Sequence, residues 1–217
     1  FHIRPEPEDP ASGPVAVASG MRARWYRTNL CPYKFGFLPD ARIPLRPFAG
    51  AFGVQLPGTN RAAGIVPGDS QENLGCRELT AGTVLYVPVR VEGAAVAVGN
   101  PCFHEESGRE DTAAWEGVSR GMALRMTIRK DLEGTLSIPL LSAPAHWVFL
   151  AVRSCLREAE RAAAGGAARF LEGRYGLSPD ESRGCLCTRA GRRIERRIDG
   201  AFIARVLIPK SITGIDL

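Results

Sequence analysis

Side chains that could do chemistry are concentrated in one short stretch near the middle of the chain. Cys102, His104, Glu105 and Glu106 lie almost consecutively. Imidazole and carboxylate groups are common general acids and bases, and together with thiolates they are the usual ligands of zinc. The stretch therefore predicts an acid/base or metal site, and the competing interpretation is a polar surface loop with a solvated histidine.

Two further residues could complete such a site, and Cys102 could also react directly. Glu116 could act as a general base for water, or it could be a surface residue beside the packed aromatic Trp115. Asn73 could donate a hydrogen bond to an oxyanion, or it could satisfy a turn. Cys102 could act as a nucleophile only if a neighbouring base deprotonates it.

A predicted β-hairpin leads into this stretch. The run Val84–Val89 sets Val84, Tyr86 and Pro88 on one face and Leu85, Val87 and Val89 on the other, Glu92 and Gly93 form a turn, and Ala94–Val98 runs back. The returning strand delivers the chain directly to the reactive side chains. A rigid hairpin would thus provide a base from which they are presented.

Two more hairpins are predicted later in the chain. Ala123–Lys130 alternates apolar and charged residues, and Thr135–Leu141 returns after a turn. Arg192–Ile198 and Ala201–Ile208 flank Asp199-Gly200, which is a strong turn signal. An additional strand is predicted at Trp147–Val152.

Between these strands the spacing of apolar residues changes to that of a helix. From Ser154 onward, apolar residues fall three or four positions apart. Gly165-Gly166 lowers the helix propensity in the middle of this helix by about 1 kcal/mol per glycine, which predicts a bend or break there. Gly176 predicts the C-terminal end of the helix. The segment Ser178-Pro-Asp-Glu181 predicts the start of a second helix that extends to about Thr188.

The order of elements predicts an α+β fold with a predominantly β, sandwich- or barrel-like body. Residues 1–14 form a linker-like, proline-rich segment, and residues 15–217 form one domain. Within that domain the β body spans about 15–152, and a closing part with a helical pair and a hairpin spans about 153–217. Because the chain begins with Phe1, we interpret it as a fragment or a processed chain.

Composition narrows the functional classes. No stretch is long and apolar enough to span a membrane, and six scattered cysteines among 217 residues favour reduced thiols in a cytoplasmic protein. An exposed hairpin edge predicts self-association into a homo-oligomer. The net charge of +5 arises largely from one run, comprising Arg189, Arg192, Arg193, Arg196 and Arg197. Without interleaved aromatic residues, this run favours a solvated strand face over a nucleic-acid site.

Several blocks together resemble the acetamidase/formamidase family. The blocks are IPLRPFAGAFGV (Ile43–Val54), NLGCRELTAGTVLYVPVRVEGAAVAVGN (Asn73–Asn100), HEESGREDTAAWE (His104–Glu116) and the closing GLSPDES, CLCTRAGRRIERRIDG and RVLIPKSI. They occur in the family's order from about Ala41 to Ile212. Members normally carry an additional part ahead of this region.

The resemblance implies hydrolysis of small carboxamides such as formamide or acetamide, assisted by zinc or another divalent metal. His104, Glu116 and Asn73 would be catalytic, and His104 with Glu105 would hold the metal. Asn100 and Cys102 would contact the amide substrate. Such chemistry needs an activated water, a donor for the developing oxyanion and an acid for the leaving ammonia.

Several reactive positions of the family are substituted in this sequence. In the simpler alignment, the family's reactive residues fall on Gly75, Asn100, Cys102, Ser107 and Arg109, whereas Glu116 matches a family glutamate. A two-residue insertion after Gly99 instead places His104 on the family histidine and Asp111 on the family glutamate, and moves Glu116 out of register. The sequence therefore leaves open a second function, a non-catalytic relative that binds a small ligand or a partner.

Overall fold

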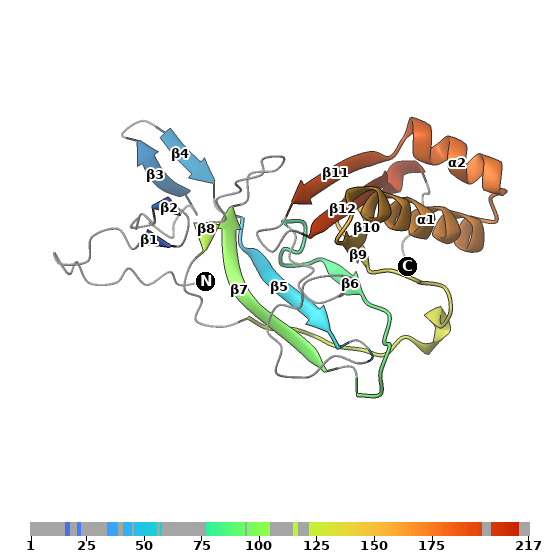
Figure 1. Ribbon diagram of the computed structural model, residues 1–217, viewed down its shortest axis with the longest axis horizontal. Coiled ribbons are helices and arrows are strands. Elements are labelled where there is room, and N and C mark those ends of the chain that lie inside the picture. Colours follow the sequence, from blue (N-terminus) through green and yellow to red (C-terminus); the bar gives the residue numbers. More distant parts are fainter. Residues whose placement is uncertain are drawn as a thin grey trace.

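The computed structural model describes residues 16–17, 21–22, 34–38, 41–44, 46–55, 57, 77–93, 95–104, 115–116, 122–196 and 201–212. Within these residues strands predominate, and both α-helices lie in the C-terminal third (Figure 1). This arrangement confirms the predicted α+β class with a predominantly β body, a C-terminal helical pair and a closing hairpin.

The strands form two small antiparallel pairs and two larger sheets. The elements up to the helices are β1 (Ala16–Val17), β2 (Met21–Arg22), β3 (Lys34–Leu38), β4 (Ala41–Pro44), β5 (Phe48–Val54), β6 (Val84–Tyr86), β7 (Val96–His104), β8 (Trp115–Glu116), η1 (Lys130–Leu132), β9 (Leu140–Ser142) and β10 (His146–Arg153). They are followed by α1 (Leu156–Tyr175), α2 (Pro179–Thr188), β11 (Gly191–Arg196), β12 (Phe202–Pro209) and η2 (Lys210–Ile212). One sheet has the order β5-β7-β8, and the five-stranded sheet has the order β11-β12-β10-β9-β6.

The main core lies between the five-stranded sheet and α1. Strands β10 and β12 are apolar along most of their length because both of their faces are covered. Trp147 and Phe149 pack against Phe170 of α1, with ring centroids 5.6 and 5.3 Å from that of Phe170. On the opposite face Leu150 and Leu207 form a second cluster, so successive residues of each strand serve two different cores.

Helix α1 begins and ends as its sequence predicts, but it does not break in the middle. It runs without interruption through Gly165 and Gly166, and Gly176 ends it in the left-handed conformation with φ of 67°. Gly166 is buried against the side chain of Ile138, an approach that only a residue without a side chain permits. Tertiary packing therefore compensates for the low helix propensity of the glycine pair.

Helix α2 has the N-terminus that the sequence predicts. The Ser178 hydroxyl accepts a hydrogen bond from the Glu181 amide, and the Glu181 carboxylate accepts one from the Ser178 amide. Pro179 occupies the first turn, where a missing amide proton costs nothing. The closing hairpin is also confirmed, because β11 and β12 pair antiparallel from Gly191↔Leu207 to Arg196↔Phe202.

The first predicted hairpin is wrong in its pairing. Both of its strands exist as β6 and β7, but β6 pairs with β9, whereas β7 pairs with β5 and β8. Strand β6 ends at Tyr86, shortly before Pro88, which has no amide proton for a ladder. The turn at Gly93, with φ of 80°, therefore connects two sheets instead of two neighbouring strands.

The second predicted hairpin is also wrong. Residues 122–129 are assigned to no strand, and the returning segment is the short strand β9, which pairs with β6 and β10. The apolar members of the alternation, Leu124, Met126 and Ile128, are 49%, 71% and 85% exposed. Self-association into a homo-oligomer, which would cover such residues, stays a prediction.

Within the described part of the chain, no helix is long and apolar enough to cross a membrane. Among the same residues no disulfide bond involves Cys102, Cys155, Cys185 or Cys187.

Candidate functional site

Strand pairing brings several of the predicted site residues together. Strand β7 carries Asn100, Cys102 and His104, and β8 carries Glu116. In the β7–β8 register Cys102 lies opposite Glu116, and His104 lies opposite Trp115, with a bulge between the two pairs. His104 and Glu116, the two residues predicted to do acid/base chemistry, therefore occupy adjacent strands, one register position apart.

Part of the predicted site lies outside the described residues. Asn73 and Glu105 belong to this group, as do three positions at which the family's reactive residues are substituted, Gly75, Ser107 and Arg109. Their proposed roles stay predictions.

The thiol of Cys102 lies in a packed interior. Cys102 is 3% exposed, and Phe48, opposite it on β5, is 4% exposed. A thiol in such surroundings packs as a small apolar side chain.

One row of residues connects this site to the loop that precedes β6. An isolated bridge joins Thr80 to Phe48, Phe48 lies opposite Cys102, and Cys102 lies opposite Glu116. Neighbouring strands are spaced about 4.8 Å apart, so the row extends across the three-stranded sheet from Glu116 to Thr80. The segment that contains Thr80 is thus joined to the edge of this sheet opposite β8.

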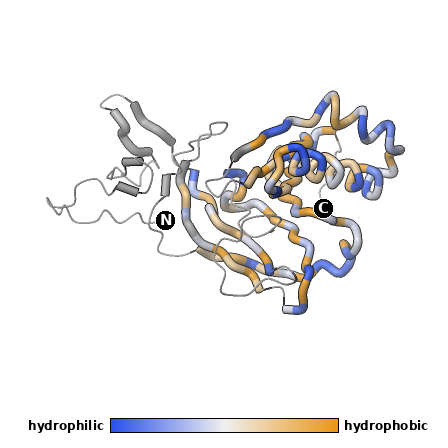
Figure 2. Tube along the Cα trace, viewed as in Figure 1, coloured by the Kyte–Doolittle hydropathy of each residue, from blue (hydrophilic) through white to orange (hydrophobic). Residues whose placement is uncertain are grey.

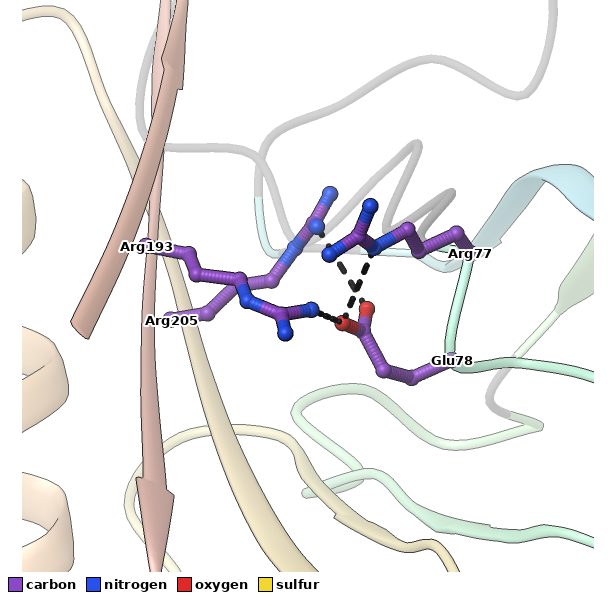
Figure 3. A network of polar contacts seen from close by, with 4 residues as sticks. All are labelled: Arg77, Glu78, Arg193 and Arg205. Carbon is purple, nitrogen blue, oxygen red and sulfur yellow. Dashed lines mark hydrogen bonds and ion pairs between the residues drawn. The ribbon is translucent and has the colours of Figure 1, made fainter. Parts of the chain in front are cut away.

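Immediately before Thr80, a buried carboxylate is surrounded by arginines. Arg193 Nη1 donates a hydrogen bond of 2.6 Å to Glu78 Oε1, and Arg77 Nε lies 3.5 Å from the same oxygen. Arg205 Nη1 lies 3.4 Å from Glu78 Oε2. Figure 3 shows the three guanidinium groups converging on this carboxylate from β11, β12 and the loop before β6. We call these four residues the Glu78 network.

Burial makes the Glu78 network electrostatically important. Glu78 is 12% exposed and Arg205 is 1% exposed, whereas Arg193 is 41% exposed. A buried guanidinium requires a carboxylate close by, because the cost of removing it from water is otherwise several kcal/mol. The network therefore fixes the loop before β6 onto β12 and so supports the row that ends at Glu116.

Sequence analysis missed the Glu78 network, although one signal pointed to it. Arg205 interrupts the apolar run of β12, and every residue from Ile203 to Ile208 is buried. A charged residue in the middle of a buried strand predicts a counter-ion. The identity of that counter-ion could not be predicted, because Glu78 is remote in sequence.

The described residues contain no cluster of metal-binding side chains. Among the residues whose side chains the structure describes, no three of the types His, Cys, Asp and Glu lie close enough together to hold an ion. On α2 Cys185 packs against the core and Cys187 is exposed.

The α+β fold described above is that of solved bacterial amidases. An acetamidase from Bacillus halodurans is 22% identical, with a TM-score of 0.65 over 84% of this chain and 60% of that one. A predicted acetamidase/formamidase from Thermoanaerobacter tengcongensis is 21% identical, with a TM-score of 0.65 over 85% of this chain and 61% of that one. An acetamidase from Yersinia enterocolitica is 15% identical, with a TM-score of 0.66 over 83% and 53%.

These likenesses support the family resemblance that the motifs indicate. No family model matches the sequence, and no curated protein matches it. The chain spans from 53% to 61% of the length of these solved structures. At these identities the comparison shows a shared acetamidase/formamidase fold.

Proposed function

We propose that the protein hydrolyses the carbon–nitrogen bond of small linear amides of the formamide and acetamide class. The observation that carries this proposal is the pairing of β7 with β8, which places His104 and Glu116 on adjacent strands. This pairing occurs within a fold shared with acetamidases. The products would be a carboxylate and ammonia.

The proposed reaction distributes its proton transfers over these residues. Glu116 accepts a proton from a water molecule, whose oxygen attacks the amide carbon. Asn73 donates a hydrogen bond to the carbonyl oxygen as negative charge develops there. The carbon–nitrogen bond then breaks, and His104 supplies the proton that allows ammonia to leave.

A divalent metal, with zinc as the first choice, forms part of the proposal. His104 and Glu105 would hold it, because imidazole nitrogen and carboxylate oxygen are typical zinc ligands. When bound, such an ion would polarise the amide carbonyl or make the water more acidic. An imidazole that holds an ion is deprotonated at the ligating nitrogen, so the proton donation by His104 described above applies to the protein without the ion.

A second function is favoured by the burial of Cys102. In the simpler alignment this thiol replaces the family histidine, and it is 3% exposed beside Phe48. A buried thiol at that position would supply neither a metal ligand nor a proton, which favours a non-catalytic relative that binds a small ligand.

Ammonia release from formamide and acetamide tests the first function. We expect turnover by the wild-type protein and its loss in His104→Ala and Glu116→Ala. His146→Ala, on β10, and Glu133→Ala, beyond η1, are the matched controls and should retain turnover. Loss of turnover on chelation, and its return when zinc is added, would support the proposed role of a divalent metal. A folded wild-type protein without turnover, which nevertheless broadens the NMR signal of acetamide, would support the ligand-binding function instead.

A further inference from the structure

A second polar feature lies on the other face of the five-stranded sheet, between α1 and the edge strand β11. An open hollow of about 250 Å³ is lined there by residues from α1, β11 and β12. Strand β11 forms one edge of the sheet, and α1 packs against β10 and β12. Figure 1 shows β11 at the edge of this sheet, next to β12.

Strand alternation determines which arginines face the hollow. Arg193 and Arg205 are directly opposite each other, and both contact Glu78 on the face of the sheet away from α1. Arg192 lies opposite Val206, and Ile194 lies opposite Ala204, so these residues face α1. Arg193 and Arg205 therefore border the hollow only with their backbone.

The α1 side of the hollow is one face of the helix. Arg157, Glu160, Arg161 and Ala164 recur at intervals of three and four residues and so lie next to one another. Arg157 and Arg161 are exposed, and Glu160 and Ala164 are half-buried. In Figure 2 the tube of α1 has both hydrophilic and hydrophobic stretches.

The hollow has a positively charged rim and an apolar floor. Arg157, Arg161 and Arg192 contribute three guanidinium groups against the single carboxylate of Glu160, and Ile194, Ala204 and Val206 lie beneath them. Within the part of the chain that the structure describes, none of the three arginines has a carboxylate within 4.0 Å. We call this hollow with its three arginines the α1–β11 groove.

We propose that the α1–β11 groove binds a small molecule that carries a phosphate group or two carboxylates. Guanidinium groups match both anions through paired hydrogen bonds, and convergence from two elements favours an anion with more than one negative charge. The apolar floor suits a short hydrocarbon or ring attached to that anion. The volume is slightly below that of typical ligand pockets, which favours a small metabolite over a long chain. This binding site is separate from the proposed hydrolytic site and does not depend on amide hydrolysis.

Calorimetric titration with inorganic phosphate and with succinate tests the proposal, with chloride added to keep the ionic strength constant. We expect saturable binding of at least one of the two anions, and the difference between them identifies the preferred group. Arg157→Gln, Arg161→Gln and Arg192→Gln should each weaken binding by about tenfold, as expected for loss of one charge-assisted hydrogen bond. Arg174→Gln, an exposed arginine in the last turn of α1, is the matched control and should bind as the wild type does.

A substitution that removes a negative charge distinguishes anion binding in the α1–β11 groove from general attraction of anions to a basic protein. Glu160→Gln removes the only carboxylate among the described residues that line the α1–β11 groove and should tighten anion binding, whereas Glu158→Gln on the same helix should leave it unchanged. Equal weakening by Arg174→Gln and Arg192→Gln, or no binding of either anion beyond that of chloride, would overturn the proposal. Circular dichroism of each variant would verify that α1 is intact.

Discussion

Removing the charge of Glu78 is expected to destabilise the protein more than removing any exposed charge of the same network. In Glu78→Gln the guanidinium of Arg205, which is 1% exposed, loses the carboxylate 3.4 Å away. At that distance and an effective dielectric constant of about 20, the attraction is about 5 kcal/mol, and desolvation of both groups offsets much of it.

We therefore expect Glu78→Gln to lower the free energy of unfolding by about 2 to 3 kcal/mol. This is less than the roughly 3 to 5 kcal/mol typical of breaking a fully buried ion pair. Two features reduce it. Glu78 retains 12% of its exposure, and the 3.4 Å separation is longer than that of a strong charge-assisted hydrogen bond. Arg193→Gln removes a partner that is 41% exposed, and we expect it to cost about 1 kcal/mol or less.

Urea unfolding followed by tryptophan fluorescence measures these differences, because Trp147 is fully buried in the main core. A double variant, Glu78→Leu with Arg205→Met, completes the experiment. It replaces both buried charges by apolar groups and should be more stable than Glu78→Gln, since no uncompensated charge remains in the interior. If Glu78→Gln costs no more than Arg193→Gln, or if the double variant is the least stable of the set, the assigned role of the Glu78 network is incorrect.

The remaining predictions concern the two helices. Gly166→Ala should destabilise the protein by about 1 to 2 kcal/mol in urea unfolding, because the new methyl group would lie 2.5 Å from Ile138 Cγ1 and overpacking outweighs the gain in helix propensity. Gly165→Ala, whose methyl group would lie 3.5 Å from the flexible Arg169 side chain, should stabilise it, and equal effects at the two positions would contradict this packing. Ser178→Ala should cost about 1 kcal/mol at neutral pH through loss of the helix cap, measured in the same way. Hydrogen bonds from the Ser178 amide and hydroxyl lower the pKa of Glu181, so its contribution to stability is complete above the unfolded pKa of about 4.3 and disappears as the pH falls through the folded value. Stability curves against pH should show this loss in the wild type but not in Glu181→Gln, and an unchanged curve in that variant would exclude the carboxylate as its source.

The local elements could be predicted from the sequence because their signals are local. The capping residues Ser178 and Glu181 and the terminal Gly176 define the helix ends through hydrogen bonds to near neighbours. The closing hairpin is likewise a contact between segments joined by a short turn. In each case the interactions that form the helix end or the hairpin lie within a short stretch of sequence.

Strand pairing between remote segments could not be predicted in the same way. The alternation around Val84 and Val96 indicates two strands but does not show that β6 pairs with β9, because many apolar strands offer equivalent partners. The Glu78 network could not be predicted for the same reason. Arg205 in an apolar strand indicates a buried charge, but the sequence does not identify the remote residue that pairs with it. The neighbourhood of His104 and Glu116 depends on the β7–β8 register, which the sequence analysis did not include.

The most direct test of the proposed function is to follow carbon-13-labelled acetamide by NMR while ammonium is measured in the same sample. We predict that wild-type protein converts acetamide to acetate, with one ammonium released for each acetate formed, and that Glu116→Gln does not. Unchanged acetamide after prolonged incubation with folded wild-type protein, with and without zinc, would contradict the central claim that β7 and β8 carry a hydrolytic site.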